Sequence, residues 1–189
     1  RIAVAHNRND QAETVMMRIM RGTGLKGLAG IDFIRADGVV IRPVLDLSRD
    51  EIERYCEENG LHPRIDSTNK EAIYTRNKIR LELLPMMKEK FNPNIVDALV
   101  RLSAQAREDE EHIMSEAMAY ADGEEPRAHA RWNKAESSLR LDGFTELHSA
   151  VAKRVIMLCA LRAGMEQNMS TVNLESALRL AENGAEGKE

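Results

Sequence analysis

The sequence predicts an α/β part followed by an all-α part, with helices dominating the chain as a whole. Residues 2–5 form a short apolar segment typical of a strand, and a polar turn and a helical pattern follow it. A second cluster of β-branched residues lies at 39–41, where we expect another strand. Beyond about residue 95 the apolar residues recur at helical spacing. A strand that leads through a turn into a helix is where α/β proteins usually bind ligands.

A helix is expected from Asp10 to about Arg21, because apolar residues there recur at helical spacing. Its expected buried stripe consists of Ala12, Val15, Met16, Ile19 and Met20. In one interpretation Asp10 and Glu13 form a capping box with Asp10 as the N-cap. In the other, both carboxylates and His6 face a ligand or a metal ion. Both interpretations can hold, since a cap can also face a site.

A glycine-rich loop follows the helix, to about Gly30. Gly22, Gly24 and Gly27 lie close to Arg21 and Lys26, so their backbone N–H groups could cradle a phosphate. Such loops are common, and the glycines alone are weak evidence. The strand expected at 39–41 should end before Pro43, which cannot donate to a ladder.

The next helix should begin at a capping box formed by Ser48 and Glu51 and stop near residues 59–60. Ile52, Tyr55 and Cys56 are expected to face inward. We assign this helix no chemistry.

Residues 66–69, Asp-Ser-Thr-Asn, allow two interpretations. They could form an Asx-turn and a cap before another helix. Alternatively, Asp66 and Asn69 could form part of the wall of a site. The residues themselves leave this open.

Arg76 and Arg80 are spaced i, i+4 and should share one helix face. Two guanidinium groups on one face suit a phosphate or a carboxylate, because the planar fork donates two parallel hydrogen bonds. The alternative is an ion pair with Glu82, or with Asp66 or Glu71.

Pro85 should end or kink that helix, and the Phe-Asn-Pro-Asn linker at 91–94 is the expected domain boundary. The sequence therefore divides into residues 1–92, which hold the candidate site, and a helical domain over 93–189. We expect helices at 95–121, 144–163 and 170–182.

Hydrophobic residues make up 43% of the chain, which is enough for a core. The two cysteines lie far apart, which favours a reducing cytoplasm and argues against a structural zinc site. The longest apolar run, residues 155–161, is too short to span a bilayer, so no membrane association is expected.

The net charge is −4, but its distribution is uneven. Residues 1–45 hold seven Lys and Arg against four acids, whereas residues 105–125 hold one Arg against eight acids. A phosphate-rich partner would dock at the first region and avoid the second. The acidic run is also typical of a solvated helix face.

Two sets of motifs resemble the tRNA(Ile)-lysidine synthetase family. The first is the run HNRNDQAETVMMRIMRGTGLKGLAGI at 6–31. The second comprises RPVLD at 42–46, DSTN at 66–69, YTRNKIR at 74–80 and LP at 84–85. The order of these blocks is similar to that family up to about residue 95. The Ser-Gly-Gly-x-Asp-Ser phosphate loop of its class does not occur here, so we expect an internal fragment that cannot make lysidine alone.

The resemblance implies an ATP-dependent, carbon–nitrogen bond-forming ligase of the cytoplasm. Its nucleotide-binding part is a Rossmann-like domain of the N-type ATP pyrophosphatase class, adenine nucleotide alpha hydrolase-like, of which residues 1–92 would be the C-terminal half. Such an enzyme uses ATP, with Mg²⁺, to activate the C2 carbonyl of the wobble cytidine in tRNA(Ile) with a CAU anticodon. The amine of free L-lysine then displaces AMP. The helical domain resembles the part that helps to hold the tRNA.

The resemblance also implies roles for residues that match the motifs. His6 would face the nucleotide, Asp10 and Glu13 would hold the lysine amine or a Mg²⁺ ion on the triphosphate, and Arg76 would steady a phosphate or the lysine carboxylate. No resident metal site is expected. The residues expected to bind substrate or nucleotide are Arg21, Gly22, Gly24, Asp66, Asn69 and Arg80. Another PP-loop-type tRNA-modifying enzyme, or a tRNA-binding module without catalysis, remains the alternative, and homodimer formation is left open.

Overall fold

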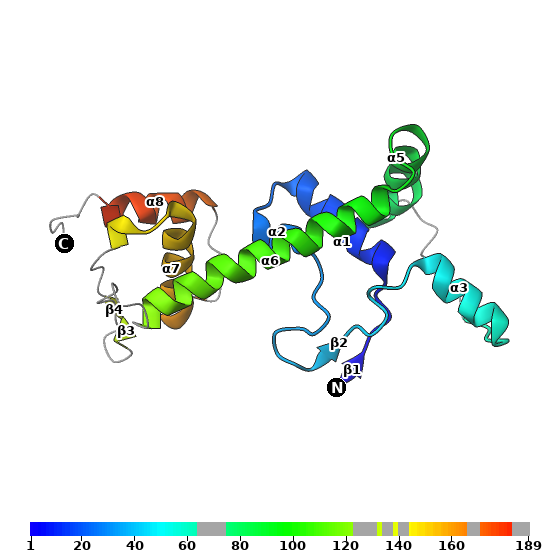
Figure 1. Ribbon diagram of the computed structural model, residues 1–189, viewed down its shortest axis with the longest axis horizontal. Helices are drawn as coiled ribbons and strands as arrows, with labels where there is room; N and C mark the ends of the chain where they lie inside the picture. Colours follow the sequence, from blue (N-terminus) through cyan, green and yellow to red (C-terminus); the bar gives the residue numbers. More distant parts are fainter. Residues whose placement is uncertain (64–74, 123–131, 134–137, 140–143, 166–170, 183–189) are drawn as a thin grey trace. The chain divides into compact units, whose positions relative to one another are not determined.

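A computed structural model describes residues 1–63, 75–122, 132–133, 138–139, 144–165 and 171–182 (Figure 1). The chain divides into two compact units, Arg1–Glu110 and Glu111–Glu189, and each is considered by itself. The elements of the first unit are β1 (Ile2–Ala3), α1 (Arg8–Arg21), α2 (Leu25–Leu28), β2 (Val40–Ile41), α3 (Arg49–Glu58), α4 (Thr75–Lys78), the π-helical turn η2 (Ile79–Leu83), α5 (Leu84–Lys90) and the start of α6 (Ile95–Asp122). Those of the second are the rest of α6, β3 (Trp132–Asn133), β4 (Ser138–Leu139), the 3₁₀ turn η3 (Phe144–Glu146), α7 (Ser149–Arg162) and α8 (Thr171–Glu182). Strands β3 and β4 form an antiparallel pair, so the prediction that this part of the chain is all-α is wrong.

Strands β1 and β2 form a parallel pair, with Ile2 opposite Val40 and Ala3 opposite Ile41. The ladder continues for one more bond, because the N–H of Val4 donates to the carbonyl of Ile41 at 3.0 Å. Parallel strands need a crossover connection, which α1 and α2 supply. Both predicted strands are therefore present, although each is shorter than its apolar segment.

Helix α1 begins two residues earlier than predicted, and its N-cap is Asn7 rather than Asp10. The Asn7 side chain accepts from the N–H of Asp10 at 3.1 Å, and the Asp10 carboxylate accepts from the N–H of Asn7 at 3.0 Å. Asp10 thus occupies the third helical position of the box, and Glu13 has no part in it. This shift frees Glu13 for a tertiary contact.

The apolar stripe of α1 is buried over only part of its length. Ala12, Val15 and Met16 belong to a core with residues from η2, α5 and α6, namely Ile79, Leu84 and Leu99. Ile19 and Met20 are 41% and 59% exposed, so the prediction that they are buried is wrong. The core cluster of this unit includes Met17 but does not extend to the last turn of α1.

A buried amide on α1 holds the backbone that follows α2. The side chain of Gln11, 5% exposed, accepts from the N–H of Ile31 at 2.6 Å and donates to the hydroxyl of Ser103 on α6 at 3.2 Å. Arg107 of α6 donates to the carbonyl of Ala29 at 2.7 Å. These bonds join α1, the residue 29–31 turn and the first part of α6.

Gly30 is required at this turn for two reasons. Its φ is +71°, which side-chain-bearing residues rarely adopt, and a Cβ there would lie 2.6 Å from the Gln11 amide. Its carbonyl also accepts from Arg18 at 2.9 Å. At Gly30, the backbone of the glycine-rich segment therefore approaches α1 closely.

Helix α3 begins at the predicted capping box, in which the Ser48 hydroxyl accepts from the N–H of Glu51 and the Glu51 carboxylate accepts from the N–H of Ser48. Ile52 and Cys56 are half-buried, but Tyr55 is 62% exposed, so its predicted inward orientation is wrong. No residue of α3 is fully buried. Local capping, more than packing, defines where this helix begins.

Pro85 does not end the helical segment that contains Arg76 and Arg80. The chain passes from α4 through η2 into α5, and the N–H of Leu84 bonds to the carbonyl of Ile79, five residues back. Proline lacks an N–H and its ring clashes with the carbonyl four residues earlier. A widened turn before Pro85 accommodates both effects, and such π-turns are frequent at functional sites.

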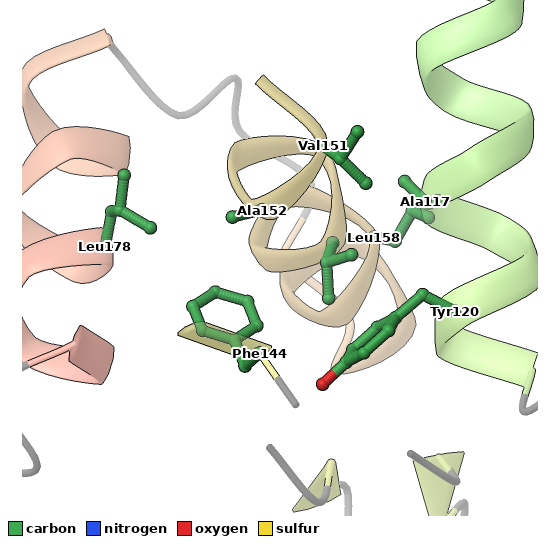
Figure 2. Close-up of a cluster of buried hydrophobic side chains, with 8 residues drawn as sticks. Ala117, Tyr120, Phe144, Val151, Ala152, Leu158 and Leu178 are labelled. Carbon is green, nitrogen blue, oxygen red and sulfur yellow. The ribbon is translucent and has the colours of Figure 1, made fainter. Parts of the chain in front are cut away.

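The second unit is built around its own apolar core (Figure 2). The ring of Phe144 lies near that of Tyr120 from α6, with centroids 6.4 Å apart, and Val155 of α7 is fully buried. The core consists of Ala117, Tyr120, Phe144, Val151, Ala152, Val155, Leu158 and Leu178. It shares no residue with the core of the first unit.

The predicted helix at 144–163 is interrupted, because η3 ends at Glu146 and α7 begins at Ser149. The Nδ1 atom of His148 caps α7 by accepting from the N–H of Ala150 at 3.2 Å. The long helix predicted at 95–121 is confirmed as α6, and the compact units divide within it. The functional boundary at 92–93 stays a prediction. Within the described ranges, no helix combines the length and apolarity needed to cross a bilayer.

Candidate functional site

The candidate site is formed where α1 faces the segment α4–η2. Asp10 and Glu13 lie one turn apart on α1, and Arg76 and Arg80 lie one turn apart across α4 and η2. Residues three and four apart share a helix face. The two carboxylates of α1 therefore face the two guanidinium groups of the α4–η2 segment.

The two guanidinium groups divide their nitrogen atoms between the two carboxylates. The Nε atoms of Arg76 and Arg80 donate to Glu13 at 2.9 and 2.6 Å. Their Nη2 atoms both donate to Oδ1 of Asp10, at 2.8 and 3.0 Å. Arg80 Nη2 also donates to Oε2 of Glu13 at 2.9 Å. The result is a closed cluster of two anions and two cations.

The two carboxylates differ in burial. The side chain of Glu13 is only 2% exposed, whereas that of Asp10 is 15% exposed. A buried carboxylate is tolerated only when it is paired and hydrogen-bonded, which Arg76 and Arg80 accomplish for Glu13. In return, the hydrogen-bonded carboxylate of Glu13 raises the pKa of the Arg80 guanidinium above its ordinary value. Glu13 is therefore the anchor of the cluster, and Asp10 is its more accessible member.

The cluster lines one wall of an open pocket of about 320 Å³. The pocket is lined by Val4, Ala5, His6, Asp10, Arg76, Asn77 and Arg80. His6 comes directly after the β1 segment, as expected for a residue at the carboxyl end of a strand. Its Nδ1 atom is buried and has no hydrogen-bond partner among the residues that the structure describes. The pocket thus combines guanidinium donors, one carboxylate and an imidazole ring.

Sequence reasoning had treated the carboxylates and the arginines as separate ligand-binding groups. The structure shows instead that Asp10 and Glu13 are neutralised by Arg76 and Arg80. The alternative prediction, that the arginines form ion pairs, is therefore confirmed, but the predicted partner was wrong. Glu82, the only predicted partner that lies within the described residues, takes no part in these contacts.

Of the remaining predicted residues, those that the structure describes are not brought to this pocket. Arg21, Gly22 and Gly24 are exposed at the C-terminal end of α1 and beyond it, and they do not line the pocket. Asp66 and Asn69 lie outside the described residues. Binding of phosphate by the glycine-rich loop therefore stays a prediction.

Two contributors escaped sequence reasoning. Asn77 lines the pocket, and its place beside Arg76 within the motif at 74–80 was a signal that could have identified it. Gln11 joins α1 by hydrogen bonds to Ile31 and Ser103. In the sequence, only its place as a polar residue beside the apolar stripe could have indicated this role.

Comparison with known proteins gives a consistent result along the chain. A family described as PP-loop domain matches residues 1–87, which implies an adenine nucleotide alpha hydrolase-like fold for this part. The tRNA(Ile)-lysidine synthase of Clostridioides difficile (strain 630) is 54% identical over 157 residues, which are 82% of this chain and 33% of that protein. The enzyme of that name from Clostridium tetani (strain Massachusetts / E88) is 42% identical over 189 residues, 100% of this chain and 39% of that protein.

A more distant relative also matches nearly the whole chain. The tRNA(Ile)-lysidine synthase of Geobacillus kaustophilus (strain HTA426) is 34% identical over 187 residues, 97% of this chain and 39% of that protein. The chain spans 33–39% of the length of these curated relatives. The match to the Clostridium tetani enzyme covers both compact units, and the motifs around Asp10 and Arg76 lie inside the PP-loop match. The chain belongs to the tRNA(Ile)-lysidine synthase family of PP-loop proteins.

Proposed function

We propose that this chain forms part of the catalytic site of an ATP-dependent ligase that converts the wobble cytidine of tRNA(Ile) with a CAU anticodon into lysidine. The observation that carries this proposal is the pocket in which His6, Asp10, Arg76 and Arg80 meet, within a sequence shared with named tRNA(Ile)-lysidine synthases. Such a pocket offers guanidinium groups to a phosphate and a carboxylate to an ammonium group.

The proposed reaction has two steps. The C2 oxygen of the cytidine attacks the α-phosphorus of ATP, so that a C2–O–P linkage forms and pyrophosphate leaves. The side-chain amine of lysine then attacks C2, a C–N bond forms, the C2–O bond breaks, and AMP leaves with the oxygen. The attacking amine must lose a proton to become nucleophilic, and a nearby carboxylate can accept it.

We propose different roles for the two carboxylates, because they differ in burial and in access to the pocket. Asp10 lines the pocket and is the one placed to meet an ammonium group. Glu13 is 2% exposed, does not line the pocket and bonds both guanidinium groups through their Nε atoms. We therefore assign ligand binding to Asp10, and to Glu13 the positioning of Arg76 and Arg80.

Magnesium has a limited place in this proposal. Asp10 and Glu13 do not suit a resident Mg²⁺ ion as they are arranged, because guanidinium groups already neutralise both. Mg²⁺ enters with ATP, whose phosphate charge it offsets. No step assigned to these residues depends on the metal. Use of ATP and tRNA places the proposed activity in the cytoplasm.

Lysine incorporation by the full-length gene product tests the proposal. Radiolabelled lysine should enter a CAU-anticodon tRNA(Ile) transcript only when ATP and Mg²⁺ are present. Asp10→Asn should lower kcat/KM by a hundredfold or more, which is within what one acid–base group contributes. Arg101→Gln, an exposed change on α6, should leave the rate unchanged.

The outcomes separate the alternatives. A folded full-length protein that incorporates no lysine would exclude lysidine synthesis and favour another PP-loop-type tRNA-modifying enzyme. Normal incorporation by Asp10→Asn would support a role for this chain in tRNA binding without a share in catalysis.

A further inference from the structure

We infer that the cluster of Asp10, Glu13, Arg76 and Arg80 couples the binding of a phosphate-bearing ligand to the binding of an ammonium group. Binding of either ligand then strengthens binding of the other. This inference rests on the proposed function, in which ATP and lysine are those two ligands. It concerns how the site responds to them.

The starting point is that the cluster satisfies itself. Two carboxylates face two guanidinium groups, and five hydrogen bonds of 2.6–3.0 Å join them. The net charge of the four side chains is zero. The cluster therefore offers an incoming ion no uncompensated partner, although Asp10, Arg76 and Arg80 all line the pocket.

The bonds divide into a fixed set and an exchangeable set. Both Nε atoms donate to Glu13, which is 2% exposed and lies behind the pocket wall. The Nη2 atoms of Arg76 and Arg80 converge on a single atom, Oδ1 of Asp10, at the pocket surface. Nη2 of Arg80 is also held by Oε2 of Glu13, so the Nη2 of Arg76 is the one that depends on Asp10 alone among the four side chains. A guanidinium group can turn its Nη2 toward a phosphate while its Nε stays hydrogen-bonded to Glu13.

An anion alone binds at a disadvantage. If Arg76 and Arg80 turn their Nη2 atoms to a phosphate, Asp10 loses both of its guanidinium partners. It then carries an uncompensated charge at 15% exposure, next to the phosphate that has displaced it. A poorly solvated, unpaired carboxylate is unfavourable, and a like charge beside it adds to the penalty.

An ammonium group alone is also at a disadvantage. To reach Oδ1 of Asp10 it must compete with two guanidinium groups within 3.0 Å of that atom. Three cations would then share two carboxylates. Once a phosphate has drawn the Nη2 atoms away, the ammonium group takes their place and neutrality returns. Each ligand removes the penalty on the other, and thermodynamic linkage makes that effect equal in both directions.

Isothermal titration calorimetry of the full-length gene product, without tRNA, tests this inference. L-lysine is titrated into protein alone and into protein saturated with α,β-methylene-ATP, in which the bond to be broken is blocked. We expect the Kd for lysine to fall tenfold or more with the nucleotide, within the usual range of coupling between sites. The Kd for the nucleotide should fall by the same factor in saturating lysine.

A lysine Kd that is the same with and without the nucleotide would overturn the inference. Lysine incorporation, measured on the same preparation, separates this outcome from failure of the proposed function. Normal incorporation with uncoupled binding refutes the coupling alone, whereas loss of incorporation refutes the function.

Asp10→Asn provides a second test that relies only on nucleotide binding. The variant removes the charge that holds the Nη2 atoms, so the nucleotide should bind at least as tightly as in the unchanged protein. Its Kd should no longer respond to lysine. Arg101→Gln, exposed on α6, should keep the full response. A lysine response retained in Asp10→Asn would contradict exchange at Oδ1.

Discussion

Glu13 is the residue on which the arrangement of the cluster depends most. Its side chain is 2% exposed and accepts from both Arg76 and Arg80. Helix α1 buries it beside the core residue Ala12, so it cannot turn to water instead. A charge held in this way stabilises the fold only while its partners are present.

Replacing Glu13 by Ala should destabilise the protein by about 3 kcal/mol, because two partly buried guanidinium groups lose their anchor. Thermal and urea unfolding, followed by circular dichroism, would measure this change. Glu53→Ala is the matched control, since Glu53 pairs with Arg49 in an exposed i, i+4 bridge on α3. It should change stability by about 0.5 kcal/mol or less. An equal loss of stability in the two variants would show that the burial of Glu13 does not contribute to the free energy of unfolding.

Sequence reasoning found Asp10, Glu13, Arg76 and Arg80 as candidates but did not pair them. Charge type and spacing along one helix are local properties. The contacts themselves join residues 63–70 positions apart, through a segment of which residues 64–74 lie outside the described structure. No local rule says which of several acids an arginine will meet.

Helix α3 is the element whose start follows most directly from local chemistry. The hydroxyl and the backbone N–H of Ser48 both donate to Glu51, and this lowers the pKa of the Glu51 carboxyl below its ordinary value. A lowered folded-state pKa means that the cap contributes stability above the unfolded-state pKa. That contribution is lost as the pH falls through the folded-state value.

Ser48→Ala should therefore return the pKa of Glu51 toward its ordinary value. Amide exchange in the first turn of α3 should become faster, because the backbone N–H of Glu51 loses the Ser48 hydroxyl that accepts from it. An NMR titration of the glutamate side chains between pH 2 and 6 would measure the first effect, and hydrogen exchange the second. An unchanged Glu51 pKa would show that the hydroxyl does not stabilise the carboxylate.

Because the two compact units have separate cores, we expect a substitution in one core to destabilise that unit alone. Phe144 is 2% exposed and central to the core of the second unit, and none of its core partners belongs to the first. Phe144→Ala should cost about 3–5 kcal/mol in that unit, because truncation leaves a cavity. Hydrogen exchange with mass spectrometry should show lost protection over 144–165 and 171–182, with residues 8–21 unaffected.

Phe91→Ala is the control for this prediction. Phe91 is 76% exposed, so its truncation should leave the exchange protection of both units unchanged. If Phe144→Ala lowered protection of α1 as strongly as that of α7, the two cores would form one cooperative unit.

The sequence by itself determined the predominance of helices, the box at Ser48 and Glu51, the long helix α6 and membership of the family. These depend on neighbours a few residues apart or on motifs read in order. Only the tertiary structure decided that Ile19 is exposed and that the two arginines neutralise Asp10 and Glu13. The physical reason is that burial and ion pairing depend on which distant segments cover a helix face, and the periodicity of that face does not encode them.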